Sequence, residues 1–391
     1  MKENTYTSSV NTTNNLSVSP AESTPATSPV RESGFELLRI LSMIMIVAFH
    51  TFRYIDTSDF TPWQMLLYHG VRWYGLFGVN CFLIISAWFM IGKPIKTRKL
   101  FDLIVQTAFY CVLLFLGHII YETVNGTFHP VEDILEVELT ALLSPFWANR
   151  YWFITAYVFL YLMIPFLNRW ILSLSRESYR KWIAVTGIFV FCYLTLPQNF
   201  SNTTAIGDFL WVCYVYFLTG YLKLHSKENI FTKHAGKLLI MTYALFVVSK
   251  QLLTYCIHND YLEQLVSHTT GNSMRYSFWM LLLAIELFYL FRRVHFKSRI
   301  INTIASCMFG VYLFHENKVF HICELLAKNL LKPFTGLIPC LPFFMLALVL
   351  IQLLAGILLD LLRQHTIETY IHTHLSTKWE SLFQKWDKKL N

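Results

Sequence analysis

The fold is indicated first by one apolar segment, Phe35-Glu36-Leu37-Leu38-Arg39-Ile40-Leu41-Ser42-Met43-Ile44-Met45-Ile46-Val47-Ala48-Phe49-His50. It reads as a membrane-spanning helix, which needs about 20 mostly apolar residues. His50 lies eleven positions after Arg39, and this spacing is close to three whole helical turns. Both side chains therefore point the same way, about 16 Å apart along the axis. Ionisable groups inside a membrane usually face the protein interior and mark a functional pathway. The segment thus predicts a buried face with a cation and an imidazole at two depths.

The composition indicates a polytopic membrane protein. Hydrophobic residues make up 55% of the 391 positions and charged residues 14%, whereas soluble domains carry about 25% charged residues. The net charge of +8 does not indicate nucleic-acid binding, because the basic residues lie in short clusters between apolar segments. The eight cysteines are scattered singly without a C-x-x-C pair, so neither a disulfide framework nor a metal site is expected.

Ten apolar segments predict an all-α bundle of about ten transmembrane helices. They cover roughly residues 35–55, 69–92, 100–121, 151–172, 182–198, 207–224, 237–256, 274–292, 301–321 and 336–362. Lysine and arginine gather in alternate loops, and cytoplasmic loops are the ones that carry this excess. The pattern therefore predicts that both termini are cytoplasmic. On this topology Arg39 lies near the cytoplasmic end of the first helix, and His50 lies in its outer half.

The two ends of the chain differ from this apolar part. Residues 1–33 are rich in Ser, Thr and Asn and are expected to be a disordered tail, because they cannot bury enough apolar surface to fold. Residues 34–362 form the predicted transmembrane domain. Residues 363–391 are expected to be a cytoplasmic tail that can form an amphipathic helix on the inner membrane surface, with Trp379, Phe383 and Trp386 among its aromatic residues.

Four stretches, taken in order, carry a family resemblance. They are the Arg39–His50 segment, Gly78-Val79-Asn80-Cys81-Phe82-Leu83-Ile84-Ile85-Ser86, Tyr151-Trp152-Phe153-Ile154-Thr155-Ala156-Tyr157 with Tyr161-Leu162-Met163-Ile164-Pro165-Phe166-Leu167-Asn168, and Gly310-Val311-Tyr312-Leu313-Phe314-His315-Glu316-Asn317. Together they resemble the membrane acyltransferase 3 family, from about residue 35 to 360. The resemblance implies a multi-pass protein of the bacterial plasma membrane. It also implies a cytoplasmic acyl-CoA, usually acetyl-CoA, as donor substrate, no permanently bound cofactor, and sugars of surface polysaccharides as acceptors.

One stretch departs from the family pattern. Many relatives carry an Arg-x-x-Arg pair just after the second helix, where this chain has Lys96-Thr97-Arg98-Lys99. Lysine keeps the positive charge but lacks the planar fork that grips phosphate with two hydrogen bonds. Lys96, Arg98 and Lys99 remain candidates for attracting the phosphates of CoA. Alternatively, they only anchor the loop on the cytoplasmic side.

His50 and Arg39 are the main catalytic candidates. A histidine can take the proton of a sugar hydroxyl near neutral pH, or it can accept the acyl group first and pass it on. The alternative is a histidine that only bonds a neighbouring helix. Arg39 could bind a CoA phosphate or an oxyanion, or pair with Glu36 one turn earlier.

Other polar residues in apolar segments are secondary candidates. His315 and Glu316 cannot both face lipid cheaply, so they could orient the sugar or assist His50, or they could form a helix–helix hydrogen bond. The candidates for substrate binding are Asn80, Trp152, Tyr157 and Asn317, because polar groups and aromatic faces commonly bind sugars. Equally, these four side chains could simply pack helices.

The sequence therefore favours a membrane O-acyltransferase whose partners are an acyl-CoA, a surface polysaccharide or lipid-linked sugar, and membrane lipids. The main alternative is a transporter or flippase for a lipid-linked sugar or small solute, since polar residues at two depths also suit a translocation path. The sequence shows no inverted repeat, which counts against transport. A third alternative is an inactive family member that acts as an assembly partner. The oligomeric state stays open.

Overall fold

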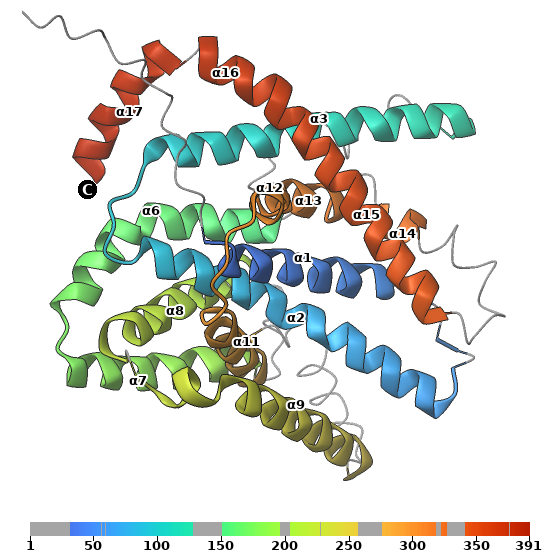
Figure 1. The fold of residues 1–391 in the computed structure, drawn as a ribbon, viewed down its shortest axis with the longest axis vertical. Helices are drawn as coiled ribbons and strands as arrows, with labels where there is room; N and C mark the ends of the chain where they lie inside the picture. Colours follow the sequence, from blue (N-terminus) through green and yellow to red (C-terminus); the bar gives the residue numbers. More distant parts are fainter. Residues whose placement is uncertain are drawn as a thin grey trace, which may run out of the picture.

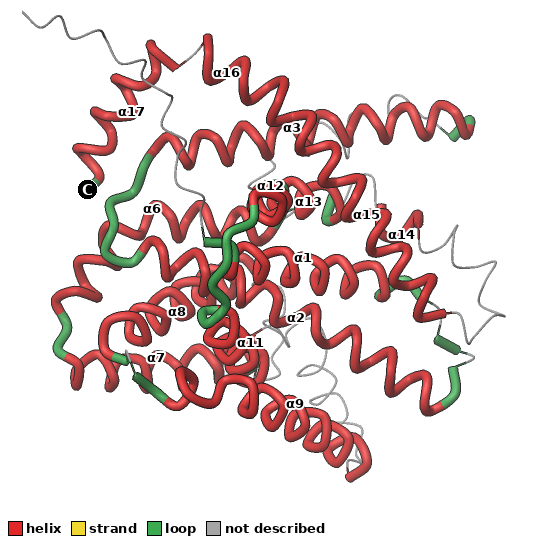
Figure 2. The backbone as a smooth tube through the Cα atoms, in the orientation of Figure 1, coloured by secondary structure: helices red, strands yellow, loops and turns green. Residues whose placement is uncertain are grey.

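The computed structural model describes residues 32–127, 151–195, 204–256, 276–317, 322–326 and 341–391, apart from residues 56, 59, 227 and 375. All regular secondary structure in these residues is helical (Figure 1, Figure 2), which confirms the all-α prediction. The predicted N-terminal tail lies outside the described residues as far as residue 31. Ser33 is an ordered part of the fold, since its N–H donates to the carbonyl of Phe296 at 2.9 Å.

The helices run in the order α1 (Gly34–Phe52), α2 (Pro62–Met90), α3 (Thr97–Asn125), α6 (Trp152–Ser173), α7 (Arg176–Thr195), α8 (Thr204–His225), α9 (Ile230–Cys256), α11 (Phe278–Phe291), α12 (Arg299–Ser306), α13 (Met308–His315), α14 (Ile322–Leu326) and α15 (Leu341–Arg363). A π-helical turn, η6 (Gln364–Glu368), then leads into α16 (Thr369–His374) and α17 (Ser376–Leu390). The α2 helix begins seven residues before the predicted start, because Thr61 and Gln64 form a reciprocal capping box with Pro62 in the first turn.

Five described helices are long and apolar enough to cross a membrane. They are Gly34–Phe52, Thr97–Asn125, Trp152–Ser173, Ile230–Ser249 and Phe343–Ile371, with two shorter apolar helices at Gly75–Met90 and Phe278–Phe291. The chain therefore has the elements of a membrane protein. The count of ten spans and the cytoplasmic placement of both termini stay predictions.

The segment predicted as one span over 301–321 is instead two helices of eight residues each, α12 and α13, which meet at Cys307. At this break, side-chain groups compete with backbone N–H groups for hydrogen bonds to the helix carbonyls. The carbonyl of Thr303 accepts hydrogen bonds from Ser306 Oγ at 2.7 Å and from Cys307 Sγ at 3.4 Å. The N–H of Cys307 donates to Ile304, three residues back. Such local bonds weaken the regular helical ladder, so the prediction of one continuous helix was wrong here.

The α1 helix lies beside α2 (Figure 1), and the two pack closely because two glycines of α2 face α1. A Cβ atom added at Gly75 would lie 2.2 Å from Phe49 Cβ, and one added at Gly78 would lie 2.7 Å from the Ser42 carbonyl oxygen. Small residues allow helix backbones to approach in this way inside a membrane. The residues between Ser42 and Phe49, which precede His50, are thus fixed against α2.

Buried polar contacts fix the other end of α1 against α15. Gln352 Nε2 donates to Thr51 Oγ1 at 2.8 Å, and Gln352 Oε1 accepts from Cys323 Sγ at 3.0 Å. Thr51 and Gln352 are fully buried, where an unmade hydrogen bond would be costly. Because Thr51 directly follows His50, this contact sets the position of the histidine backbone.

Candidate active site

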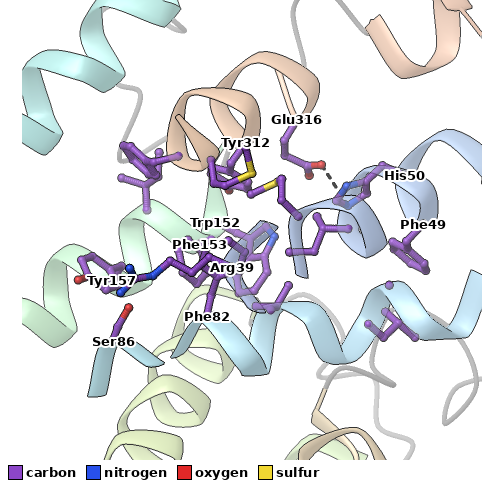
Figure 3. A pocket seen from close by; sticks show the side chains of 18 of the residues that line it. Arg39, Phe49, His50, Phe82, Ser86, Trp152, Phe153, Tyr157, Tyr312 and Glu316 are labelled. Atoms are coloured by element: carbon purple, nitrogen blue, oxygen red, sulfur yellow. Dashed lines mark ion pairs between the residues drawn. The ribbon is translucent and has the colours of Figure 1, made fainter. Parts of the chain in front are cut away.

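A cavity of about 520 Å³ runs along α1 and is lined by the three ionisable residues of that helix, Glu36, Arg39 and His50. Its walls come chiefly from α1, α2, α6, α12 and α13 (Figure 3). Its polar and charged lining residues are Glu36, Arg39, His50, Arg53, Ser86, Asp208, Ser306 and Glu316. Its aromatic lining residues are Phe49, Phe82, Trp152, Phe153, Tyr157, Phe309 and Tyr312. The volume lies within the range of sites that hold small molecules.

Three titratable side chains meet at one end of this cavity. Nδ1 of His50 lies 3.1 Å from Nε2 of His315. Nε2 of His50 lies 3.1 Å from Oε2 of Glu316, and Figure 3 marks this pair with a dashed line. Nδ1 of His315 lies 2.8 Å from the carbonyl oxygen of Val311. His315 is buried, while His50 and Glu316 are 21% and 14% exposed and line the cavity. The imidazole of His50 therefore lies between an inner histidine and a carboxyl group at the cavity wall.

The partners of these nitrogens determine where one proton lies. A carbonyl oxygen only accepts, so His315 must carry its proton on Nδ1 and donate it to Val311. A neutral His315 then accepts at Nε2 from His50 Nδ1–H, which leaves Nε2 of His50 to share a proton with Glu316. If His315 is doubly protonated, His50 accepts at Nδ1 and donates from Nε2–H to Glu316. In both cases one proton lies between His50 Nε2 and Glu316 Oε2.

Removal of this proton leaves the chain of hydrogen bonds one proton short. Two acceptor atoms then face each other at 3.1 Å, either between His50 and Glu316 or between His50 and His315. Two acceptors that face each other at a partly buried position are unfavourable. The deprotonated cluster is therefore suited to take up one proton from a group that enters the cavity, which is the task of a general base.

Arg39 lies toward the other end of the cavity, near the start of α1. Its Nη1 donates to both carboxylate oxygens of Glu36 at 2.6 Å. Its guanidinium also points toward Tyr157 and Ser86 (Figure 3). The local ion pair considered from the sequence is thus present, and Arg39 still lines the cavity. The eleven-residue spacing did predict that Arg39 and His50 share one face of the helix.

The four residues predicted to bind substrate separate into two groups. Trp152 and Tyr157 line the cavity. Asn80 is fully buried away from it, where its Oδ1 accepts from Trp211 Nε1 at 2.8 Å between α2 and α8. Asn317 is also buried and donates to the hydroxyl of Tyr151 at 2.7 Å. In this structure the two asparagines hold helices and chain turns together and do not line the cavity wall.

The basic stretch after α2 lies outside the cavity lining as well. Arg98 Nη1 lies 2.8 Å from Oε2 of Glu380 in α17, while the side chains of Lys96 and Lys99 are exposed.

Sequence reasoning did not single out Tyr312 or Asp208, although both line the cavity. The position of Tyr312 three residues before His315 on a short helix was a usable signal. Asp208 has no comparable signal, because it joins the cavity from α8 only through tertiary packing.

His50, His315 and Glu316 are also the residues that could hold a metal ion, since one ligand atom from each lies within 4.8 Å of the others. The hydrogen bond from His315 Nδ1 to Val311 is the kind that orients metal-binding imidazoles. In the present arrangement, however, His50 turns different nitrogens to His315 and to Glu316. A shared ion would require one nitrogen of His50 to face both partners, so the geometry fits a hydrogen-bonded chain better.

Comparison with known proteins identifies the family of the chain. A family model described as "Acyltransferase domain" matches residues 32–361. The chain therefore belongs to the membrane acyltransferase 3 family, as the four motifs predicted, and it is an acyltransferase by family. Neither a search of curated proteins nor a search of solved structures gave a match.

Proposed function

We propose that this protein is an O-acyltransferase of the plasma membrane. It moves an acyl group, most simply acetyl, from cytoplasmic acyl-CoA to a hydroxyl group of a cell-surface polysaccharide or its lipid-linked precursor. The observation that carries this proposal is one cavity that holds Arg39 near one end and the His50–Glu316 pair near the other. Arg39 and His50 both reach this cavity from α1.

The separation of the two ends suits an acyl-CoA donor. Arg39 and His50 are about 16 Å apart along the axis of α1, comparable to the extended pantetheine arm between the diphosphate and the sulfur of CoA. A phosphate bound near Arg39 would place the thioester carbonyl near His50. On the predicted topology, Arg39 is the end nearer the cytoplasm, where acyl-CoA is made. The acceptor then meets the thioester in the outer half of the membrane.

The His50 cluster supplies the proton transfers that the reaction needs. The hydroxyl oxygen of the acceptor attacks the thioester carbonyl carbon, and its proton passes to the deprotonated His50–Glu316 pair. The tetrahedral intermediate then breaks its C–S bond, and the thiolate takes the proton back to leave as the free CoA thiol. A variant of this route forms an acyl-imidazole on His50 before the acceptor arrives. Both routes balance without any further reactant.

The test uses purified protein in lipid nanodiscs with radiolabelled acetyl-CoA and a cell-surface polysaccharide extract. Wild type should release free CoA thiol and transfer label to the polysaccharide. His50→Ala should abolish both, because it removes the base, which lies between His315 and Glu316. Retained transfer in this variant at equal protein level would refute the role of His50. Uptake of a solute or lipid-linked sugar without CoA release would instead support transport.

A matched control variant distinguishes loss of the catalytic side chain from loss of the folded structure. His118 is a histidine of α3 that does not line the cavity, so His118→Ala should keep full activity. Thermal unfolding of both variants in detergent should match that of wild type. Loss of activity in both variants would indicate a general loss of structure and would not support the proposed role.

A further inference from the structure

The C-terminal helix α17 carries two kinds of charge, and its acidic residues are both engaged by the rest of the fold. Oδ1 of Asp387 accepts from the N–H and from the hydroxyl of Thr97, each at 2.7 Å. Oε2 of Glu380 accepts from Arg98 Nη1 at 2.8 Å. No other acidic residue occurs between positions 376 and 390. Both acidic side chains of α17 are therefore already engaged within the fold, Glu380 by a cation and Asp387 by the start of α3.

This engagement also completes the start of α3. The residue before α3, Lys96, makes no side-chain cap hydrogen bond, so the first N–H of the helix would lack a partner. Asp387 caps it from α17, 290 residues away in sequence, and a carboxylate at a helix N-terminus is favourable. Phe383 is buried beside this cap, with its ring 5.4 Å from that of Phe101. The docking of α17 on α3 is thus specific.

The docked edge leaves the other sides of α17 uncovered. Glu380, Phe383 and Asp387 recur at helical spacing and form the edge on α3. Next to this edge, Trp386 and Leu390 are 49% and 41% exposed. The remaining arc holds three exposed lysines, Lys385, Lys388 and Lys389. The exposed part of α17 is therefore aromatic and aliphatic on one side, while the other side carries lysines and no acidic residue.

The position of α17 matches the edge of a membrane. It lies against the first turn of α3, one of the helices long enough to span. In the view of Figure 1 it runs across the direction of α3. Tryptophan is enriched at the membrane–water interface, and interfacial helices combine such an apolar side with a lysine-rich polar side. On the predicted topology this is the cytoplasmic leaflet, whose anionic lipids attract basic segments.

We propose that α17 is a binding element for anionic phospholipid of the inner leaflet, with Trp386 and Leu390 inserted at the interface and Lys385, Lys388 and Lys389 at the level of the headgroups. Charge complementarity selects this partner, since Glu380 pairs with Arg98 and Asp387 caps α3, while the exposed lysines lie on the other side of the helix. The inference does not rest on the acyl-transfer reaction.

The test places the photoreactive residue p-benzoyl-phenylalanine at position 386 of the full chain. The chain is reconstituted in vesicles of phosphatidylcholine mixed in equal parts with phosphatidylglycerol, one of the two lipids being radiolabelled at a time. One basic residue near an anionic surface is worth about 1 kcal/mol, which corresponds to about fivefold in binding. We therefore expect several-fold more crosslinking to phosphatidylglycerol than to phosphatidylcholine. The same probe at Gln384, which is exposed on the polar side, should crosslink to lipid much less.

Charge variants make the test specific. The triple variant Lys385→Gln/Lys388→Gln/Lys389→Gln should bring the lipid preference close to one. A matched variant, Arg180→Gln/Lys233→Gln/Lys237→Gln, removes three exposed basic charges from α7 and α9 and should leave the preference unchanged. Absence of lipid crosslinks at position 386, or equal crosslinking to both lipids in the unsubstituted background, would overturn the proposal. Crosslinking that CoA suppresses regardless of the lipid would assign these lysines to the donor instead.

Discussion

Glu316→Gln is the substitution that most directly tests the proton chain at His50. The new amide keeps nearly the same shape and can still donate a hydrogen bond to Nε2 of His50, so folding should be little affected. It cannot carry the negative charge that faces a protonated His50 at 3.1 Å. Two unit charges about 4 Å apart interact by about 4 kcal/mol at an effective dielectric constant near 20. The amide dipole of the new glutamine recovers part of this attraction, so the substitution destabilises protonated His50 by about 3 kcal/mol.

This loss should appear as slower turnover. Each 1.4 kcal/mol in a barrier is about tenfold in rate, so Glu316→Gln should lower the rate of CoA release by about a hundredfold. The KM for acyl-CoA should change little, because Arg39 and the rest of the donor path are untouched. The assay is initial CoA thiol release in nanodiscs at saturating acceptor, over a range of acetyl-CoA concentrations.

The control for this experiment is Glu177→Gln on α7, where the carboxylate pairs with Lys181 at the exposed surface. Exposed pairs of this kind contribute little to stability, and this variant should keep wild-type turnover. The reasoning would be refuted if Glu316→Gln retained turnover within about threefold of wild type while its thermal unfolding was unchanged. His50 would then have to act without its carboxylate partner.

Two further predictions concern the other end of the cavity and its wall. Arg39→Lys should raise the KM for acyl-CoA about tenfold with a smaller change in turnover, because lysine lacks the planar fork for phosphate, and an unchanged KM would remove Arg39 from the donor site. Gly75→Ala places a Cβ 2.2 Å from Phe49 Cβ and 2.5 Å from the Met45 carbonyl oxygen, so it should destabilise the protein by about 1–3 kcal/mol. Gly117→Ala, whose Cβ would meet nothing within 4 Å, should leave the thermal midpoint as in wild type.

Features that depend on a single helix, such as which side chains share a face, could be predicted from the sequence. The spacing of eleven positions from Arg39 to His50 fixes the shared direction of these side chains wherever the segment is helical, and both residues do line one cavity. The all-helical class and the family followed from composition and from four ordered motifs. Helix starts were less predictable, because a cap such as the Thr61–Gln64 box extends α2 into residues that hydropathy alone left outside.

The contact between His50 and His315 could not be predicted in the same way. These residues are 265 positions apart, and their meeting depends on the break at Cys307, where the sequence indicated one continuous span. The break separates a short helix that ends at His315 from the helix before it. Likewise, the apolar segment around Asn80 gave no sign that its amide would bond Trp211 away from the cavity. Both outcomes are set by packing between distant helices.

The two ends of the cavity follow one physical rule, although the proposed reaction assigns them different steps. Each base on α1 already has a carboxyl group in contact, Glu36 for Arg39 and Glu316 for His50. A buried charge without a partner would be strongly destabilising, so both pairs keep the empty cavity close to neutral. A donor phosphate must therefore compete with Glu36 for Arg39. An acceptor hydroxyl only needs to deliver a proton to the pair at His50. Binding of the donor should accordingly weaken with added salt, whereas the proton transfer at His50 should not.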